Sequence, residues 1–415
     1  MPKTKFRIKN PFAAVGRRRK KKTSPYMTEE PVNEYYLKLS ERFGTLSVVL
    51  LMILPAFLFV AIFLNRKQIT SDNLYYLFKD INAASELAGS GGNEFQYPRS
   101  DSMDFAVYKK GLAAIGEKEL CLYTATGRQT LNTATSYSTP IVRASGKYVL
   151  TYDLGGKNVA LYNSFARIFR KTYEYPVNFA TIGESGAFLT VTSDSTYTSV
   201  VEVYSAGFSL INQITKNGYV ISGALSDKAV HGALATVQAT DGNFTTEIMT
   251  FVPGSEKGVE KWTLEGTFPI GITYLSEDRL LVVCDNASYV FSNTGRQVHR
   301  YDYDGKKLSR YAVGNGDFAL LFADSALSGH HLVTAFDKNG DERYRKELQT
   351  NISGIGLCDG YLFLLLPDGV QRVNLFTKSE ALTACTTDDR TLLVISKEEI
   401  LLCSPVQGTY VKIKE

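Results

Sequence analysis

The chain has 415 residues, of which 44% are hydrophobic and 21% are charged, a composition that excludes an intrinsically disordered protein. The net charge of +4 hides a division, because residues 1–42 carry 12 Lys or Arg against 4 Asp or Glu. Residues 43–415 therefore carry 34 basic and 38 acidic residues, a net charge of −4, which makes nucleic acid and other polyanions poor partners for that part of the chain.

The first predicted element is an uncharged run of 22 residues, Phe43 to Leu64. As a helix it spans roughly 33 Å at 1.5 Å per residue, enough to cross a bilayer core of about 30 Å. No small-residue cleavage site follows Leu64, so we expect an uncleaved signal anchor rather than a removed signal peptide. No second apolar span follows, which predicts a single-pass membrane protein of the cell membrane.

The flanking charges predict the orientation of this helix. Residues 1–42 form a basic tail that contains the run Arg17 to Lys22, and an excess of Lys and Arg in a short tail favours the cytoplasmic side. We expect the tail to lie in the cytoplasm against anionic lipid, and residues beyond the helix to be extracytoplasmic. The expected lipid contacts are therefore residues 43–64 and the basic tail.

Residues 65–103 are predicted to form a helical stem and a linker. Ser71 can cap a helix over residues 71–88, and Leu74, Leu77 and Ile81 fall on one face of it. Gly89 to Gly92 then end the helix and open a polar linker.

Residues 104–415 show a repeat of short apolar strands and turns, and we expect this range to be a single all-β domain. An aromatic residue that closes a strand recurs at intervals of 39, 42, 47, 40, 45 and 40 residues. These aromatic residues are Tyr123, Tyr162, Tyr204, Phe251, Phe291, Phe336 and Phe376. A period near 42 with four strands per unit is typical of a β-propeller.

Strongly apolar strands, suited to a position covered on both faces, give the number of blades. They centre on Ala114, Leu150, Leu189, Leu234, Val282, Leu320, Leu364 and Leu393. Eight centres predict eight blades, with seven as the second choice, because the last unit is compressed. We expect one outer strand of that last unit to be missing or very short.

Residues that could support chemistry are scattered. Five cysteines (Cys121, Cys284, Cys358, Cys385 and Cys403) lie in apolar strands without a CxxC pair, which favours buried free thiols over disulfides or zinc. Four histidines (His231, His299, His330 and His331) lack a metal-ligand spacing. We therefore expect no catalytic residue, no metal site and no cofactor.

Three aspartates follow apolar strands and are the candidates for a site in the central channel: Asp153, Asp285 and Asp368. Aspartate at a strand end more often serves the turn itself. A cluster of ionisable groups facing the channel would favour a propeller enzyme or ligand sensor, and its lack would favour a non-catalytic binding scaffold.

Several stretches resemble an uncharacterised family of bacterial, mostly Gram-positive, single-pass membrane proteins with an extracytoplasmic propeller-like domain. They are Thr70 to Leu74, Phe78 to Ile81, Tyr108 to Leu112 and Pro140 to Lys157. The blades are also similar to quinoprotein and WD40-like repeats, but quinoproteins close their blades with tryptophan motifs and this chain has one tryptophan, Trp262. The family has no known function, so the resemblance transfers no catalytic residue. A similar repeat without a cofactor is used by envelope assembly scaffolds, and by that analogy we expect a scaffold that binds another envelope protein.

Overall fold

The computed structural model describes residues 50–57, 94–240, 243–323, 329–387 and 390–413. The chain divides into two compact units, Met1–Ile69 and Thr70–Glu415. In the first unit, residues 50–57 are helical and their apolar side chains are exposed. No helix among the described residues is long and apolar enough to cross a membrane, and the expected span 43–64 is described only over residues 50–57. The basic tail 1–42 and the expected helix 71–88 lie outside the described residues.

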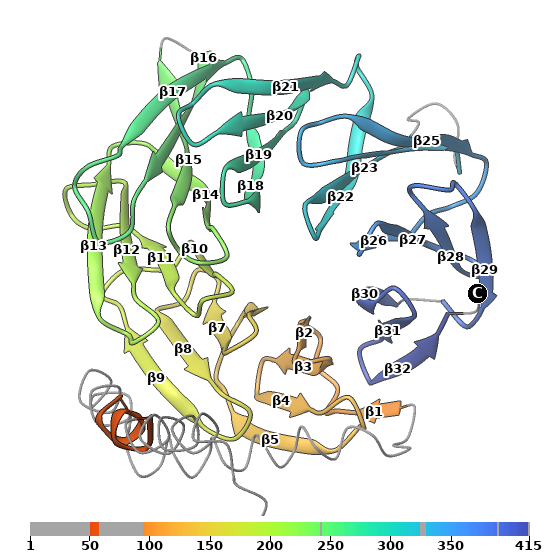
Figure 1. Cartoon of the computed structure of the whole chain (residues 1–415), viewed down its shortest axis with the longest axis horizontal. Helices are drawn as coiled ribbons and strands as arrows, with labels where there is room; N and C mark the ends of the chain where they lie inside the picture. Colours follow the sequence, from red (N-terminus) through yellow and green to blue (C-terminus); the bar gives the residue numbers. More distant parts are fainter. Residues whose placement is uncertain (1–49, 58–93, 241–242, 324–328, 388–389, 414–415) are drawn as a thin grey trace, which may run out of the picture. The chain divides into compact units, whose positions relative to one another are not determined.

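In the second unit, the described residues form eight four-stranded antiparallel sheets arranged in a ring (Figure 1). The chain is an eight-bladed, all-β propeller, which confirms the predicted fold and the preferred blade number. Blades 1 to 7 each use four strands that are consecutive in the sequence. At seven of the eight junctions between blades the first strands contact one another closely, so the first strand of each blade is the innermost.

The strand bounds follow the chain around the ring. Blades 1 and 2 comprise β2 (Met103–Tyr108), β3 (Gly111–Gly116), β4 (Glu119–Tyr123), β5 (Gln129–Ala134), β6 (Pro140–Ala144), β7 (Val149–Asp153), β8 (Asn158–Tyr162) and β9 (Arg167–Thr172). Blades 3 and 4 comprise β10 (Phe179–Ile182), β11 (Phe188–Thr192), β12 (Ser199–Tyr204), β13 (Leu210–Lys216), β14 (Tyr219–Leu225), β15 (Gly232–Thr240), β16 (Asn243–Phe251) and β17 (Glu260–Glu265). Blades 5 and 6 comprise β18 (Pro269–Ser276), β19 (Arg279–Cys284), β20 (Ala287–Ser292), β21 (Gln297–Asp302), β22 (Lys307–Gly314), β23 (Asp317–Ala323), β24 (His331–Phe336) and β25 (Glu342–Leu348). Blades 7 and 8 comprise β26 (Gly354–Cys358), β27 (Tyr361–Leu366), β28 (Gly369–Asn374), β29 (Glu380–Ala384), β30 (Thr391–Ser396), β31 (Glu399–Cys403), β32 (Gln407–Lys412) and β1 (Glu94–Gln96).

Blade 8 is completed by residues from the beginning of the domain. Its strand order is β30-β31-β32-β1 (Figure 1), and in the register of that pairing Phe95 of β1 lies opposite Gly408 of β32. The outer strand that the compressed last unit lacks is therefore supplied by residues 94–96. Residues 94–96 lie inside the range 65–103 that the sequence analysis assigns to the stem and linker. The propeller therefore begins about ten residues before the expected boundary at 104, although β2, the first strand of blade 1, starts close to that boundary at Met103.

The apolar strands occupy the second position of each blade because that position is covered on both faces by neighbouring blades. In β19, residues Leu280 to Cys284 are all buried, as are residues Leu362 to Leu366 of β27. Seven of the eight predicted centres lie in second strands. Leu393 is the exception, since it lies in the innermost strand β30, and the second strand of blade 8 is β31.

The recurring aromatic residue is the last residue of the third strand of a blade, or the next-to-last in the case of Phe291, and it is buried. Six of the seven predicted positions fit this role: Tyr123, Tyr162, Tyr204, Phe251, Phe291 and Phe336. Phe376 differs, because it lies in the turn after β28 with its side chain 66% exposed. In blade 7 the strand-closing position is taken by Asn374, whose Oδ1 accepts hydrogen bonds from the backbone N–H groups of Phe376 and Thr377.

Because strands within a blade are antiparallel, the ring has two distinct faces. We call the first the crossover face, since it carries the blade-to-blade connections and the turns between second and third strands. The opposite hairpin face carries the turns between first and second strands and between third and fourth strands. Innermost strands begin at the crossover face and end at the hairpin face.

Candidate functional site

The predicted aspartates serve the loops of their own blades. Asp153 is 7% exposed, and its Oδ1 accepts hydrogen bonds from the backbone N–H groups of Ser138 and Thr139, both at 2.8 Å. Asp285 Oδ1 accepts one from the Phe268 N–H at 2.9 Å. In both cases the carboxylate holds in place the loop that leads into the innermost strand. Aspartate commonly has this structural role in turns, where it accepts hydrogen bonds from backbone N–H groups.

The third aspartate and the other candidate groups do not form a cluster. Asp368 is exposed in the turn between β27 and β28. All five cysteines are free thiols, and burial raises the pKa of the Cys284 thiol to about 12. Across the described parts of the chain, no three His, Cys, Asp or Glu side chains gather where they could hold a metal ion.

A cavity of about 390 Å³ opens at the ring axis on the crossover face. The innermost strands of four consecutive blades, β18, β22, β26 and β30, and the residues just before them line it. Its lining is Ile270, Leu308, Ser309, Arg310, Tyr311, Ser353, Gly354, Ile355, Arg390, Thr391 and Leu392. Sequence reasoning missed this site, since none of its residues belongs to a recognisable motif.

Bulges in the innermost strands shape the mouth of this cavity. In β18 the pairing with β19 skips Ile270, and in β22 the pairing with β23 skips Ser309. In β14 of the preceding blade the pairing with β15 skips Ile221. A bulge inserts an unpaired residue and re-aims the side chains next to it. Three neighbouring blades are thus modified at the same edge, and the side chain of Ile270 is 45% exposed there.

The two arginines of the cavity differ in how they are held. Arg390 Nη1 donates to the Thr409 Oγ1 at 2.7 Å and to the Leu402 carbonyl oxygen at 3.3 Å, which anchors it to blade 8. Arg310 is exposed and forms no salt bridge with any carboxylate of the described residues. The lining contains no Asp, Glu or His, so the cavity is positively charged.

Tyr311 lies beside Arg310 and contacts the neighbouring blade. A Cβ atom on Gly271 would lie 2.1 Å from the Tyr311 hydroxyl oxygen, so only glycine lets this ring approach the β18 backbone. Burial raises the pKa of Tyr311, and the Arg143 charge opposes the rise. The hydroxyl therefore stays protonated at neutral pH and is a hydrogen-bond donor.

Exposed apolar side chains lie on the same crossover face as the cavity. Phe268 precedes β18, and its ring meets that of Phe244 edge to face with centroids 6.4 Å apart. The β15–β16 hairpin extends past its neighbours, because Tyr219, the first residue of β14, pairs with Val237 while the hairpin continues to Thr240. Tyr219 and Phe244 are 66% and 57% exposed.

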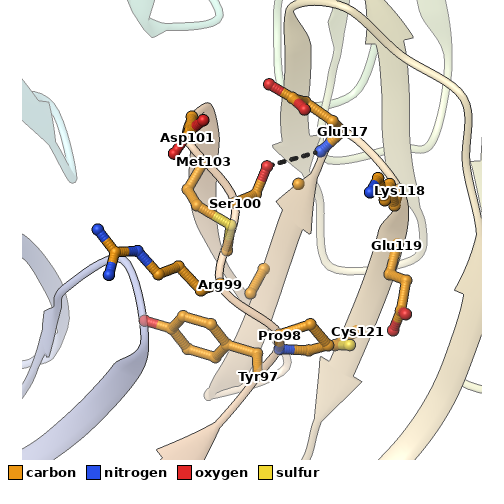
Figure 2. Close-up of a pocket in the computed structure, with 12 residues that line it drawn as sticks. Tyr97, Pro98, Arg99, Ser100, Asp101, Met103, Glu117, Lys118, Glu119 and Cys121 are labelled. Carbon is orange, nitrogen blue, oxygen red and sulfur yellow. Dashed lines mark hydrogen bonds between the residues drawn. The ribbon is translucent and has the colours of Figure 1, made fainter.

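A second cavity, of about 300 Å³, lies at the seam where the ring closes (Figure 2). It is lined by the segment Tyr97 to Asp101 and by β3 and β4. The Glu117 N–H donates to Ser100 Oγ at 3.2 Å, and the charged side chains do not converge, since Arg99 and Glu119 extend in opposite directions (Figure 2). This cavity belongs to the closure of the ring, and the axial cavity is the better candidate for a site.

Comparison with known proteins gives likenesses at the level of the fold. A solved structure of BamB from Moraxella catarrhalis is 13% identical, with a TM-score of 0.48, over 76% of this chain and 99% of that chain. The WD40 domain of Pan2 from Neurospora crassa is 9% identical, with a TM-score of 0.45, over 76% of this chain and 91% of that one. No curated protein matches the chain. A family model matches residues 92–402, which include β1, and the chain therefore belongs to a family of unknown function, DUF5711.

Proposed function

We propose that this chain is a non-catalytic binding protein of the bacterial cell envelope, anchored in the membrane by residues 43–64 and holding its propeller outside the cell. The crossover face is the surface that binds, and the partner is another envelope protein. The observation that carries this proposal is the combination on one face of an open axial cavity with exposed Phe268, Phe244 and Tyr219.

Exposed aromatic side chains beside a cavity favour protein binding. Tyr and Phe are enriched at protein interfaces because they bury large apolar areas at low conformational cost. The cavity offers two arginines and several hydroxyl groups but no carboxylate or histidine among its described lining. Such a set is suited to binding an anionic group, and it lacks the usual general acid or base.

The membrane anchor is argued from the sequence. Phe43 to Leu64 are uncharged and long enough to cross a bilayer, and the basic tail favours a cytoplasmic N-terminus. The exposed apolar side chains of the helix over residues 50–57 are compatible with a lipid environment.

The test is cross-linking in living cells followed by purification of the full chain. The control is a chain truncated after residue 92, which keeps the anchor and stem but lacks the propeller. We expect specific protein partners that are lost with the propeller. Turnover of a small molecule by the purified chain, abolished by changing the axial cavity, would overturn the proposal in favour of a channel enzyme.

A further inference from the structure

The axial cavity concentrates positive charge in an acidic part of the chain. Residues 43–415 carry a net charge of −4, yet Arg310 and Arg390 are the only charged residues in the described lining. A positively charged cavity in a weakly negative domain attracts anions to the cavity but not to the rest of the surface. The ligand should therefore carry an anionic group at one point rather than along its whole length.

Arg310 can bind the anionic group of the ligand, whereas Arg390 already donates hydrogen bonds to residues of blade 8. Arg390 is committed to Thr409 and to the Leu402 carbonyl, and it contributes its charge from a fixed position. Arg310 is exposed at the mouth without a carboxylate partner in the described structure. A guanidinium presents a planar set of N–H donors that matches both oxygens of a carboxylate.

The other residues that line the cavity indicate which part of the ligand lies next to its anionic group. Leu308, Ile355 and Leu392 give the cavity an apolar wall, and the bulged Ile270 extends that wall to the rim. Phe268, two residues before Ile270 in the chain, is also exposed, and its ring meets that of Phe244. A volume of about 390 Å³ suits a few side chains rather than a folded domain.

We propose that the axial mouth binds an extended peptide segment of the partner protein in which acidic residues alternate with apolar residues. An acidic side chain pairs with Arg310, and an apolar neighbour packs among Ile270, Leu308 and Ile355. A free small carboxylate would occupy the cavity but leave the exposed rings of Phe268 and Phe244 on the same face uncovered, and these exposed rings favour a peptide. This inference rests on the proposed function and identifies the part of the partner that the crossover face recognises.

The experiment measures binding of two fluorescent hexapeptides to the purified full chain by anisotropy. One alternates Asp and Leu, and the other replaces each Asp with Asn. We expect the acidic peptide to bind more tightly, and its affinity to fall as salt is raised, because an exposed ion pair is screened. Equal binding of the two peptides would overturn the inference.

Variants then locate the binding. Arg310→Gln should weaken the acidic peptide roughly fivefold, and Arg310→Lys should restore part of the loss. Ile270→Glu should weaken it further by placing a like charge at the rim. Arg296→Gln, which removes an exposed arginine from a turn on the hairpin face, is the matched control and should change nothing. Equal losses in the Arg310 and Arg296 variants would contradict the assignment.

Two further outcomes separate the possible failures. Binding of hexanoate as tight as that of the acidic peptide, and equally dependent on Arg310, would overturn the peptide in favour of a small carboxylate ligand. If partners are captured in cells through the propeller but remain captured by the Arg310→Gln chain, the proposed function stands and this inference fails. If no partner is captured, the proposed function itself fails.

Discussion

At the scale of single residues, one turn recurs on the hairpin face. In several blades the residue four positions after the aromatic residue at the end of the third strand has a positive φ, as in Gly127, Gly295 and Gly340. Each of these glycines donates its N–H to the carbonyl of the residue that follows the strand-closing aromatic. Left-handed backbone is costly for residues with a Cβ, which explains why the aromatic and the later glycine recur together in the sequence.

In the corresponding turn of blade 7, Lys378 has a φ of 60°, its N–H donates to the Asn374 carbonyl, and its side chain is exposed. Lys378→Gly should therefore stabilise the propeller by about 0.5–1 kcal/mol, because glycine removes the left-handed strain. Chemical denaturation measures this change. Lys306→Gly, at an exposed turn position without a positive φ, is the control and should not stabilise. If Lys378→Gly destabilised the chain, the left-handed backbone at Lys378 would not be a source of strain.

Gly295 gives the opposite case, because it combines a φ of 75° with a close neighbour. A Cβ atom there would lie 2.8 Å from Cε3 of Trp262. We expect Gly295→Ala to cost at least about 1 kcal/mol and to shift the fluorescence of the sole tryptophan. Unchanged stability together with an unchanged emission spectrum would show that this turn is less constrained than the structure indicates.

At the scale of elements, outer strands carry lysines that reach carboxylates of the next blade. Lys171 Nζ of β9 lies 2.5 Å from Glu202 Oε2 of β12, and Tyr204 donates to the same oxygen. Lys216 of β13 pairs with Glu247 of β16, and Lys346 of β25 pairs with Glu380 of β29. These pairs join adjacent blades at a radius where apolar packing between the blades thins out.

Glu202 makes the first of these contacts dependent on pH. Burial would raise the pKa of Glu202, but hydrogen bonds from Lys171 and Tyr204 outweigh it and lower the pKa below its usual 4.5. A carboxyl with a depressed folded pKa stabilises the fold above its unfolded pKa and loses that contribution as the pH falls through the folded value. Acidification below about pH 4.5 should therefore weaken the contact between blades 2 and 3.

Glu202→Gln should lower the stability at pH 7 by about 2 kcal/mol and flatten the loss of stability below pH 4.5. Denaturation curves at pH 7, 5 and 3.5 measure both effects. Glu256→Gln changes an exposed carboxyl in the turn between β16 and β17 and is the matched control. If the Glu202→Gln chain lost as much stability below pH 4.5 as the unchanged chain, Glu202 would not be the source of the acid dependence.

The elements also show how much of the fold the sequence could predict. Second strands such as β27 were predictable because burial on both faces leaves an uninterrupted apolar run. Strand β1 was not, because residues 94–96 become a strand only by pairing with residues 407–409, about 300 positions away. The axial cavity was missed for the same kind of reason, since the bulges at Ile270 and Ser309 exist only in the register between two strands.

At the scale of the whole molecule, closure of the ring depends on a short segment. Phe95 is 1% exposed, and its ring meets Tyr123 of blade 1 edge to face with centroids 5.6 Å apart. Tyr97 donates its hydroxyl to the Ser404 carbonyl of blade 8 at 2.6 Å. Residues 95–97 therefore connect the first blade to the last.

Phe95→Ala should destabilise the domain by about 3–5 kcal/mol, because it removes a fully buried ring from this connection. Deletion of residues from about 380 onward should unfold the domain, since it removes blade 8. Thermal unfolding followed by circular dichroism measures both. Phe376→Ala, which truncates a mostly exposed ring, is the control. A soluble and cooperatively folded chain that ends near residue 380 would count against closure as the source of stability.

The proposed topology gives a prediction for intact cells. Protease added from outside should remove the propeller and leave a small membrane-bound fragment that carries residues 1–42. The basic tail should be protected because it lies in the cytoplasm. A propeller that becomes accessible to protease only after the cells are opened would contradict the proposed orientation.

The central claim, that the crossover face binds a partner protein, is tested most directly by a photo-cross-linking amino acid placed at one phenylalanine on each face. Phe244 on the crossover face and Phe376 on the hairpin face are the same residue type and are 57% and 66% exposed. Irradiation of living cells should yield a specific adduct with an envelope protein from position 244 and none from position 376. Adducts from position 376 alone, or equally from both positions, would contradict the account.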